Sequence, residues 1–123
     1  MLTLEKKSYY SYNDLVSAMD TEILIECHEG SYQGDSHYLM KKNDEYGILT
    51  FGWGSCSGCD ALEAIDGDYD KVVSFMNDLY DEIKWMSLDE MKASINSTDF
   101  EDKFYFWTSE GSEFVKKIRE WAS

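Results

Sequence analysis

The spacing of apolar residues changes along the chain, from a helical period near the N-terminus to alternation in the segment that follows. A short helix is predicted over residues 12–19, because Ser11 and Asp14 form an N-terminal capping pair and the apolar residues after them have helical spacing. A half-buried strand is predicted over Thr21–His28, since alternate residues there would face a core: Ile23, Ile25 and Cys27.

A β-hairpin and a set of helices are predicted for the rest of the chain. The arms of the hairpin are Ser36–Lys42 and Tyr46–Trp53, joined by the polar segment Asn43-Asp44-Glu45. Capping patterns and apolar spacing predict further helices over 61–65, 69–85, about 88–95 and the C-terminal residues, with Phe104–Trp107 as a fourth strand. Together these elements predict one α+β domain over residues 1–123, with a small, mainly antiparallel sheet of three to four strands packed by four to five helices.

The chain is strongly acidic but apolar enough to fold. Hydrophobic residues make up 43% of the 123 residues, and 25 Asp and Glu against 11 Lys and Arg give a formal net charge of −14. This charge argues against direct binding to nucleic acid, because affinity for a phosphate backbone comes from Lys and Arg. Three cysteines are too few and too odd in number for a disulfide scaffold. With no apolar core typical of a signal peptide and no run as long as a membrane span, we expect a cytoplasmic protein with no membrane partner.

Cys56-Ser57-Gly58-Cys59 is the motif with a recognisable chemical use. Two thiols at this spacing close a disulfide or supply two ligands of a metal site. The motif lies before a predicted helix start, where free N–H groups stabilise a thiolate. The adjacent Asp60 opposes thiolate formation, and no Lys or Arg lies within ten residues. A tight turn of small residues is the first interpretation, and a zinc-binding or thiol-redox domain is the alternative.

A zinc site at this motif would need two further ligands. Cys56, Cys59, Cys27 and His37 would form such a set if the first strand and the hairpin packed beside the turn. Cys27, however, is expected on the apolar face of its strand and therefore in the core. We expect His28 and His37 at the surface or at a sheet edge rather than on a metal, and so expect no cofactor.

No sequence motif indicates an enzyme. A nucleotide-binding loop, a nucleophile elbow and a metalloprotease helix are all missing from the sequence. Asp35, Ser36 and His37 do not form a catalytic trio, because neighbouring side chains on a strand point to opposite faces. We therefore expect a protein without enzymatic activity.

Acidic residues gather in two segments, of which one follows an unusual tryptophan. Trp53 stands between two glycines, and the turn after it leads to an acid-rich segment over 60–70. We predict an interaction surface in which Trp53 is partly exposed beside a contiguous acidic rim, formed by Asp60, Glu63, Asp66, Asp68 and Asp70. The second group is Asp99, Glu101 and Asp102. The simpler interpretation of both is a solvated face that keeps the protein soluble. The sharper one is a surface that imitates nucleic-acid phosphates and occupies a basic groove on a partner.

The segment Tyr32-Gln-Gly-Asp35 and the run Phe51-Gly-Trp-Gly-Ser-Cys-Ser-Gly-Cys-Asp60 resemble a family of small uncharacterised proteins of phages and prophage-rich bacterial genomes. The resemblance covers about a third of the chain, from Gly30 to Ile65, and implies a setting in the bacterial host cytoplasm. Small acidic phage proteins without catalytic motifs often inhibit host machinery. Together with the charge, this association predicts a non-enzymatic protein-binding inhibitor of a host defence or nucleic-acid-binding protein, a DNA mimic of anti-CRISPR-like character. The partner would then be a basic host protein. A toxin-immunity protein has the same profile and stays an alternative.

Overall fold

The computed structural model describes residues 2–30, 33–54, 60–65, 67–100 and 113–123. Within them the elements follow in the order α1 (Tyr12–Ala18), β1 (Glu22–Gly30), β2 (Gln33–Lys42), β3 (Glu45–Gly54), α2 (Ala61–Ile65), α3 (Tyr69–Asp81), α4 (Leu88–Asn96) and α6 (Glu113–Ala122). The three strands form an antiparallel sheet in the order β1-β2-β3. The predicted α+β fold with a small antiparallel sheet is confirmed.

The helices begin where the capping patterns predict. Ser11 and Asp14 form a reciprocal capping box at the start of α1, and Ser87 and Glu90 form one at the start of α4. The Asp68 side chain accepts from the backbone N–H of Lys71 and so caps α3. Each cap satisfies backbone donors that have no partner within the helix.

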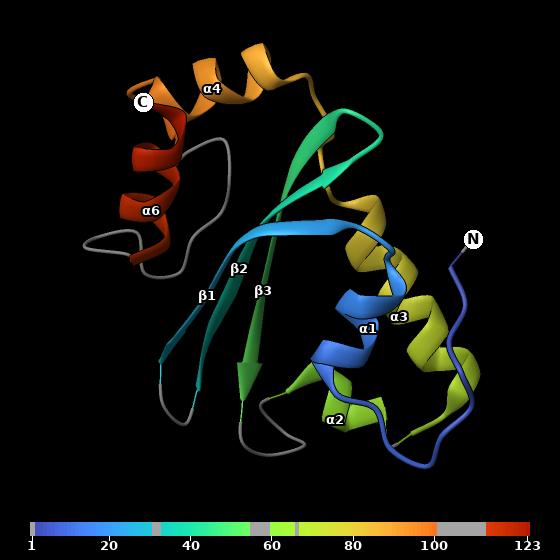
Figure 1. The fold of residues 1–123 in the computed structure, drawn as a ribbon. Coiled ribbons are helices and arrows are strands. Elements are labelled where there is room, and N and C mark those ends of the chain that lie inside the picture. Colours follow the sequence, from blue (N-terminus) through green and yellow to red (C-terminus); the bar gives the residue numbers. More distant parts are fainter. Residues whose placement is uncertain (1, 31–32, 55–59, 66, 101–112) are drawn as a thin grey trace.

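The sheet separates two apolar clusters, one on each face. In Figure 1, α1, α2 and α3 lie on one side of the sheet and α4 and α6 on the other. The first cluster joins α1–α3 to the strand residues Tyr38, Met40, Leu49 and Phe51. The second joins α4 and α6 to Cys27, Leu39 and Ile48. Consecutive residues of β2 therefore enter different clusters, as the alternation of side chains along a strand requires.

The hairpin between β2 and β3 is tighter than predicted. Its loop has two residues, Asn43 and Asp44, which both have positive φ, and Lys42 pairs with Glu45. Asn and Asp tolerate this backbone conformation better than other non-glycine residues, and two such residues form the turn that suits the twist of a hairpin.

Three expectations about the elements need correction or stay untested. The alternation predicted for β1 is interrupted by a register shift between Ile23 and Ile25, which leaves Ile23 39% exposed. The third helix ends at Asp81 instead of residue 85. The fourth strand predicted at Phe104–Trp107 lies outside the described residues. None of the helices in the described ranges is long and apolar enough to cross a membrane.

Candidate interaction surface

Trp53 lies near the end of β3, on the sheet face that carries the first apolar cluster. Its cross-strand partner on β2 is Gly34, which brings no side chain to cover the indole. Trp53 packs against the cluster but stays partly exposed. The sequence prediction of a partly exposed Trp53 is confirmed.

Asp60 lies beyond Trp53 and does not belong to an exposed rim. Asp60 is only 5% exposed. Its carboxylate accepts four hydrogen bonds from described residues. Oδ1 accepts from the backbone N–H of Leu62 and Glu63, at 2.9 and 3.1 Å, so that Asp60 caps α2. Oδ2 accepts from the N–H of Gly54 at 2.8 Å. The expectation that Asp60 forms part of the rim is wrong, because its carboxylate is used to join β3 to α2.

Tyr12 is the fourth partner of Asp60 and connects α1 to the same point. Its hydroxyl donates to Oδ1 of Asp60 at 3.0 Å, and its ring stacks on Phe51 with centroids 4.4 Å apart. Burial raises the pKa of Tyr12 well above its usual value, and the nearby Asp60 carboxylate raises it further. The phenol therefore stays protonated and keeps donating to Asp60 over the physiological pH range.

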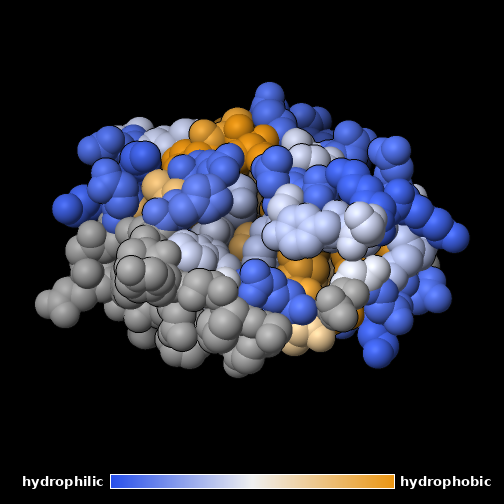
Figure 2. All heavy atoms as spheres, turned by 90° about the horizontal axis from the view of Figure 1, so that it is seen from below, coloured by the Kyte–Doolittle hydropathy of each residue, from blue (hydrophilic) through white to orange (hydrophobic). Residues whose placement is uncertain are grey.

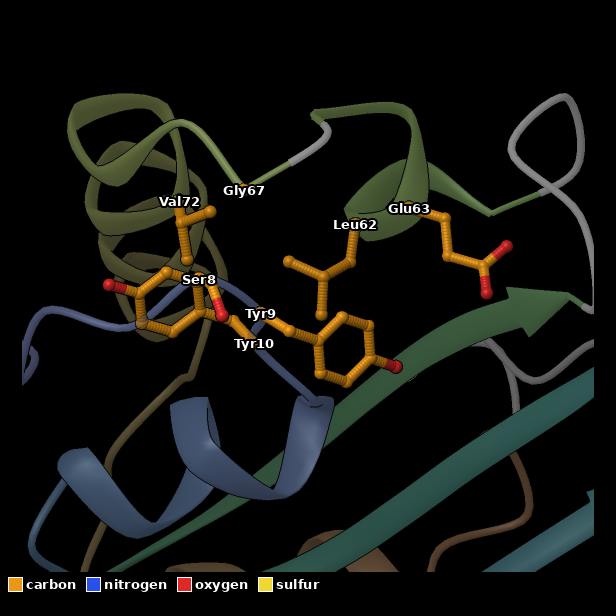
Figure 3. A pocket seen from close by; sticks show the side chains of 7 residues that line it. All are labelled: Ser8, Tyr9, Tyr10, Leu62, Glu63, Gly67 and Val72. Atoms are coloured by element: carbon orange, nitrogen blue, oxygen red, sulfur yellow. The ribbon is translucent and has the colours of Figure 1, made fainter.

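Two adjoining hollows lie along this end of the molecule. One, of about 220 Å³, is lined by residues that include Tyr9, Tyr12, Trp53, Asp60 and Glu63. The other, of about 240 Å³, shares Tyr9 and Glu63 and extends to Gly67 and Val72. Figure 3 shows Leu62 and Val72 of this second hollow pointing towards the tyrosine rings of the 8–10 segment. Tyr9 is 67% exposed, so an aromatic ring borders both hollows at the surface.

A third hollow, of about 270 Å³, lies on the other side of Trp53. Tyr12 and Trp53 line it as well, together with Asn13, Tyr38 and a chain of three polar side chains from β1 and β2. In that chain Ser36 Oγ lies 2.6 Å from His28 Nδ1, and His28 Nε2 lies 2.6 Å from Glu26 Oε2. Neutral imidazole satisfies both contacts if Ser36 donates to Nδ1 and Nε2–H donates to Glu26. His28 is exposed, as predicted.

The order Ser36–His28–Glu26 resembles that of a hydrolytic triad, but its surroundings favour binding. Ser36 is only 2% exposed, whereas a nucleophile must reach its substrate. It lies on the middle strand, whose backbone pairs with β1 on one side and β3 on the other. Backbone N–H groups paired in this way are not available for the oxyanion of a transition state. The arrangement instead links the exposed His28 ring and Glu26 carboxylate to the buried Ser36.

The remaining acids of the predicted rim are distributed over α2 and the start of α3. Glu63, Asp68 and Asp70 are exposed, and Asp68 also caps α3; Asp66 lies outside the described residues. In Figure 2, a view from below Figure 1, hydrophobic residues reach the surface between hydrophilic ones. The structure thus places Trp53, Glu63 and buried Asp60 around one hollow, with Asp68 and Asp70 on the adjoining helix start.

The predicted metal ligands are only partly visible. Cys27 and His37 are cross-strand neighbours on the face covered by α6, and both are buried. The expectation of a surface position is therefore wrong for His37, whose ring stacks on Phe114 with centroids 5.2 Å apart. Cys56 and Cys59 lie outside the described residues. Within the part of the chain that the structure describes, no group of three or more His, Cys, Asp or Glu side chains could hold a metal ion.

No family model, no curated protein and no solved structure matches this chain. The resemblance to phage proteins therefore stays a prediction, and the assignment of this surface depends on its geometry.

The chain formed by Glu26, His28 and Ser36 was not predicted from the sequence. The signal was present, because Glu26 and His28 are two residues apart on one strand and therefore share a face. A turn centred between Gly30 and Gly34 places Ser36 opposite His28, as the observed register does. No sequence pattern indicates that Tyr9 and Tyr12 line the hollows, because their positions depend on how the N-terminal segment packs.

Proposed function

We propose that this chain is a non-enzymatic protein-binding domain that binds a basic partner through the surface around Trp53. The single observation that supports it most is the position of Trp53, a partly exposed aromatic residue that lines two hollows, one of them together with the exposed Glu63 of α2. Aromatic residues in pockets are the side chains that contribute most to the affinity of protein interfaces. Acids around them select for a positively charged partner.

The exposed acids near Trp53 are not neutralised within the described part of the chain. Glu63, Asp68 and Asp70 have no ion pair there within 4.0 Å, whereas Asp14 pairs with Lys7 at 3.1 Å. With 25 acids against 11 Lys and Arg, the whole chain repels itself and attracts cations. Such a field raises the association rate with a basic protein and is weakened by salt.

The finer part of the proposal names the partner as a nucleic-acid-binding protein of a bacterial host, which the chain inhibits as a phage- or prophage-encoded protein. Its support is the charge and the sequence resemblance. A toxin-immunity protein is the alternative within the same class. The two differ in whether DNA or RNA competes with the chain for its partner.

The test compares charge reversal at the surface with the same change elsewhere. The variant E63K/D70K reverses one exposed acid that lines two hollows and one exposed acid at the start of α3, but leaves both Asp60 and the helix cap Asp68 intact. The control D89K/E120K makes the same change in charge on α4 and α6. Partners captured from bacterial lysate are identified by mass spectrometry, purified, and titrated at several salt concentrations.

We expect the wild type and D89K/E120K to bind one basic partner with salt-sensitive association and E63K/D70K to lose that binding. Thermal denaturation should show all three to be folded, because exposed substitutions usually change stability by less than about 0.5 kcal/mol. Displacement of the chain by DNA or RNA would support the finer proposal. Equal binding by both variants would contradict the surface and direct attention to the second acidic group around Asp99. Salt-independent binding would contradict the electrostatic argument.

A further inference from the structure

The hollow of about 270 Å³ beside Trp53 combines an aromatic lining with a carboxylate. Its aromatic residues come from three elements: Tyr12 from α1, Tyr38 from β2 and Trp53 from β3. Its volume is at or below the lower end of the range of about 300–1,000 Å³ for small-molecule sites. A single side chain therefore fits this hollow better than a cofactor-sized ligand.

Two of the three aromatic rings, those of Tyr12 and Tyr38, are held in place before any ligand binds. Tyr12 stacks on Phe51, and its hydroxyl donates to the buried Asp60. The Tyr38 ring stacks on Phe51 as well, with centroids 5.9 Å apart, and is only 3% exposed. A preorganised site loses little conformational entropy on binding, so even a small hollow can contribute to affinity.

The Glu26 carboxylate is exposed, bonds to His28 and has room for a further donor. Its Oε2 atom lies 2.6 Å from Nε2 of His28, whose ring is fixed in turn by Ser36 and by an edge contact with Tyr38. A carboxylate offers about four acceptor sites on its two oxygens. Oε1 can therefore accept from an incoming cation while Oε2 keeps its bond to His28.

We propose that this hollow binds an arginine side chain of the basic partner, with the guanidinium against the partly exposed Tyr12 and Trp53 rings and its N–H groups donating to Glu26. The proposal rests on the proposed function for the source of the arginine. Charge complementarity favours a cation, because the chain carries −14 and Glu26 lies at the hollow. A planar guanidinium stacks on aromatic faces and spreads its donors in a fork that matches a carboxylate, whereas the lysine ammonium is a strongly hydrated point charge.

The experiment titrates the full chain, labelled with ¹⁵N, with the capped tripeptide acetyl-Gly-Arg-Gly-amide. The matched peptides replace arginine with lysine or with citrulline, which keeps the shape but has no charge. The test variant is E26Q, and the matched control E45Q removes the same charge from an exposed residue at the far end of the same sheet. NMR shifts of the Trp53 indole N–H and of the Asn13 and His28 amides report on the hollow.

We expect saturable binding of the arginine peptide with a Kd on the order of 1 mM. The citrulline peptide and the E26Q variant should each bind roughly five- to tenfold more weakly, as expected for the loss of a partly screened charge-assisted hydrogen bond. Lysine should also bind more weakly than arginine, and E45Q should match the wild type. W53L, checked for folding by circular dichroism, should reduce binding by a similar factor.

Three results would overturn the arginine site: no saturation at roughly 20 mM peptide, equal binding of arginine and citrulline, or an equal loss for E26Q and E45Q. Its failure is distinguishable from failure of the proposed function. If E63K/D70K abolishes binding of the partner while E26Q leaves both peptide and partner unaffected, the surface stands and the arginine site does not. If the peptides bind as expected but binding of no partner depends on Glu63 and Asp70, the arginine site stands and the proposed surface does not.

Discussion

Replacing Asp60 with alanine tests whether this residue organises the interaction surface. The side chain accepts three backbone N–H bonds and the Tyr12 hydroxyl bond while only 5% exposed. Loss of an N-cap costs about 1 kcal/mol, and loss of a hydrogen bond to a carboxylate costs about 1.5–3 kcal/mol. The bonds to Gly54 and Tyr12 come in addition to the cap. Because relaxation and water recover part of the sum, we expect D60A to lower the free energy of unfolding by about 3–5 kcal/mol.

Urea denaturation followed by tryptophan fluorescence measures this loss. D60N keeps the size of the side chain and one acceptor oxygen, so it should lose roughly half as much as D60A. D70A is the matched control, because Asp70 is exposed in the first turn of α3 and should change stability by less than about 0.5 kcal/mol. The denaturant dependence of all four proteins should be equal if the native state keeps its compactness. Equal stabilities of D60A and D70A would refute the structural role of Asp60.

The pH dependence of stability above pH 9 reports on Tyr38. Burial, and then the negative charge of Glu26, raise the pKa of Tyr38 from 10.0 to about 12. Between these values the unfolded chain binds fewer protons than the folded one, so stability should fall as pH rises, and Tyr38 alone should account for a loss of about 2 kcal/mol by pH 12. Y38F should therefore show a shallower slope in urea unfolding, and an unchanged slope would contradict the assignment. G67A should lower the free energy of unfolding by about 1–3 kcal/mol, because Gly67 has φ +76° and an added Cβ would lie 2.9 Å from the Ser8 carbonyl oxygen. Unchanged stability in the same assay would show that the 8–10 segment does not pack against this turn.

The parts of the fold that the sequence predicts well are those set by local chemistry. The capping boxes at Ser11 and Ser87 fixed two helix starts, and the turn residues between β2 and β3 placed the hairpin. In each case neighbouring residues satisfy backbone groups or set backbone angles, so a short stretch of sequence contains the whole reason.

The errors arise where distant segments decide the outcome. Alternation predicted a regular β1, but a register shift after Ile23 changes which residues face the core. His37 was expected at the surface or at a sheet edge rather than on a metal, yet α6 brings Phe114 over its ring. Only tertiary packing determines both results, and neither the period of β1 nor the residue types around His37 contain that information.

The role of Asp60 in the site also depends on contacts between distant segments. Within the sequence it is one of five acids over 60–70, and counting charge makes it equivalent to Glu63 or Asp70. The structure separates them, because only Asp60 can reach Gly54 across the turn while capping α2.

This separation determines how the surface should be tested. Trp53 and Tyr12 line two hollows, and Asp60 joins the segments that hold both: it bonds to the residue after Trp53 and to the Tyr12 hydroxyl. Removing Asp60 would therefore disturb the aromatic lining as well as the fold, and a loss of binding would not identify a contact. A loss of binding is easier to interpret at Glu26, Glu63 and Asp70, because these residues are exposed and none of them joins two of these segments. Variants at these three positions can distinguish charge that meets a partner from charge that only keeps the protein soluble.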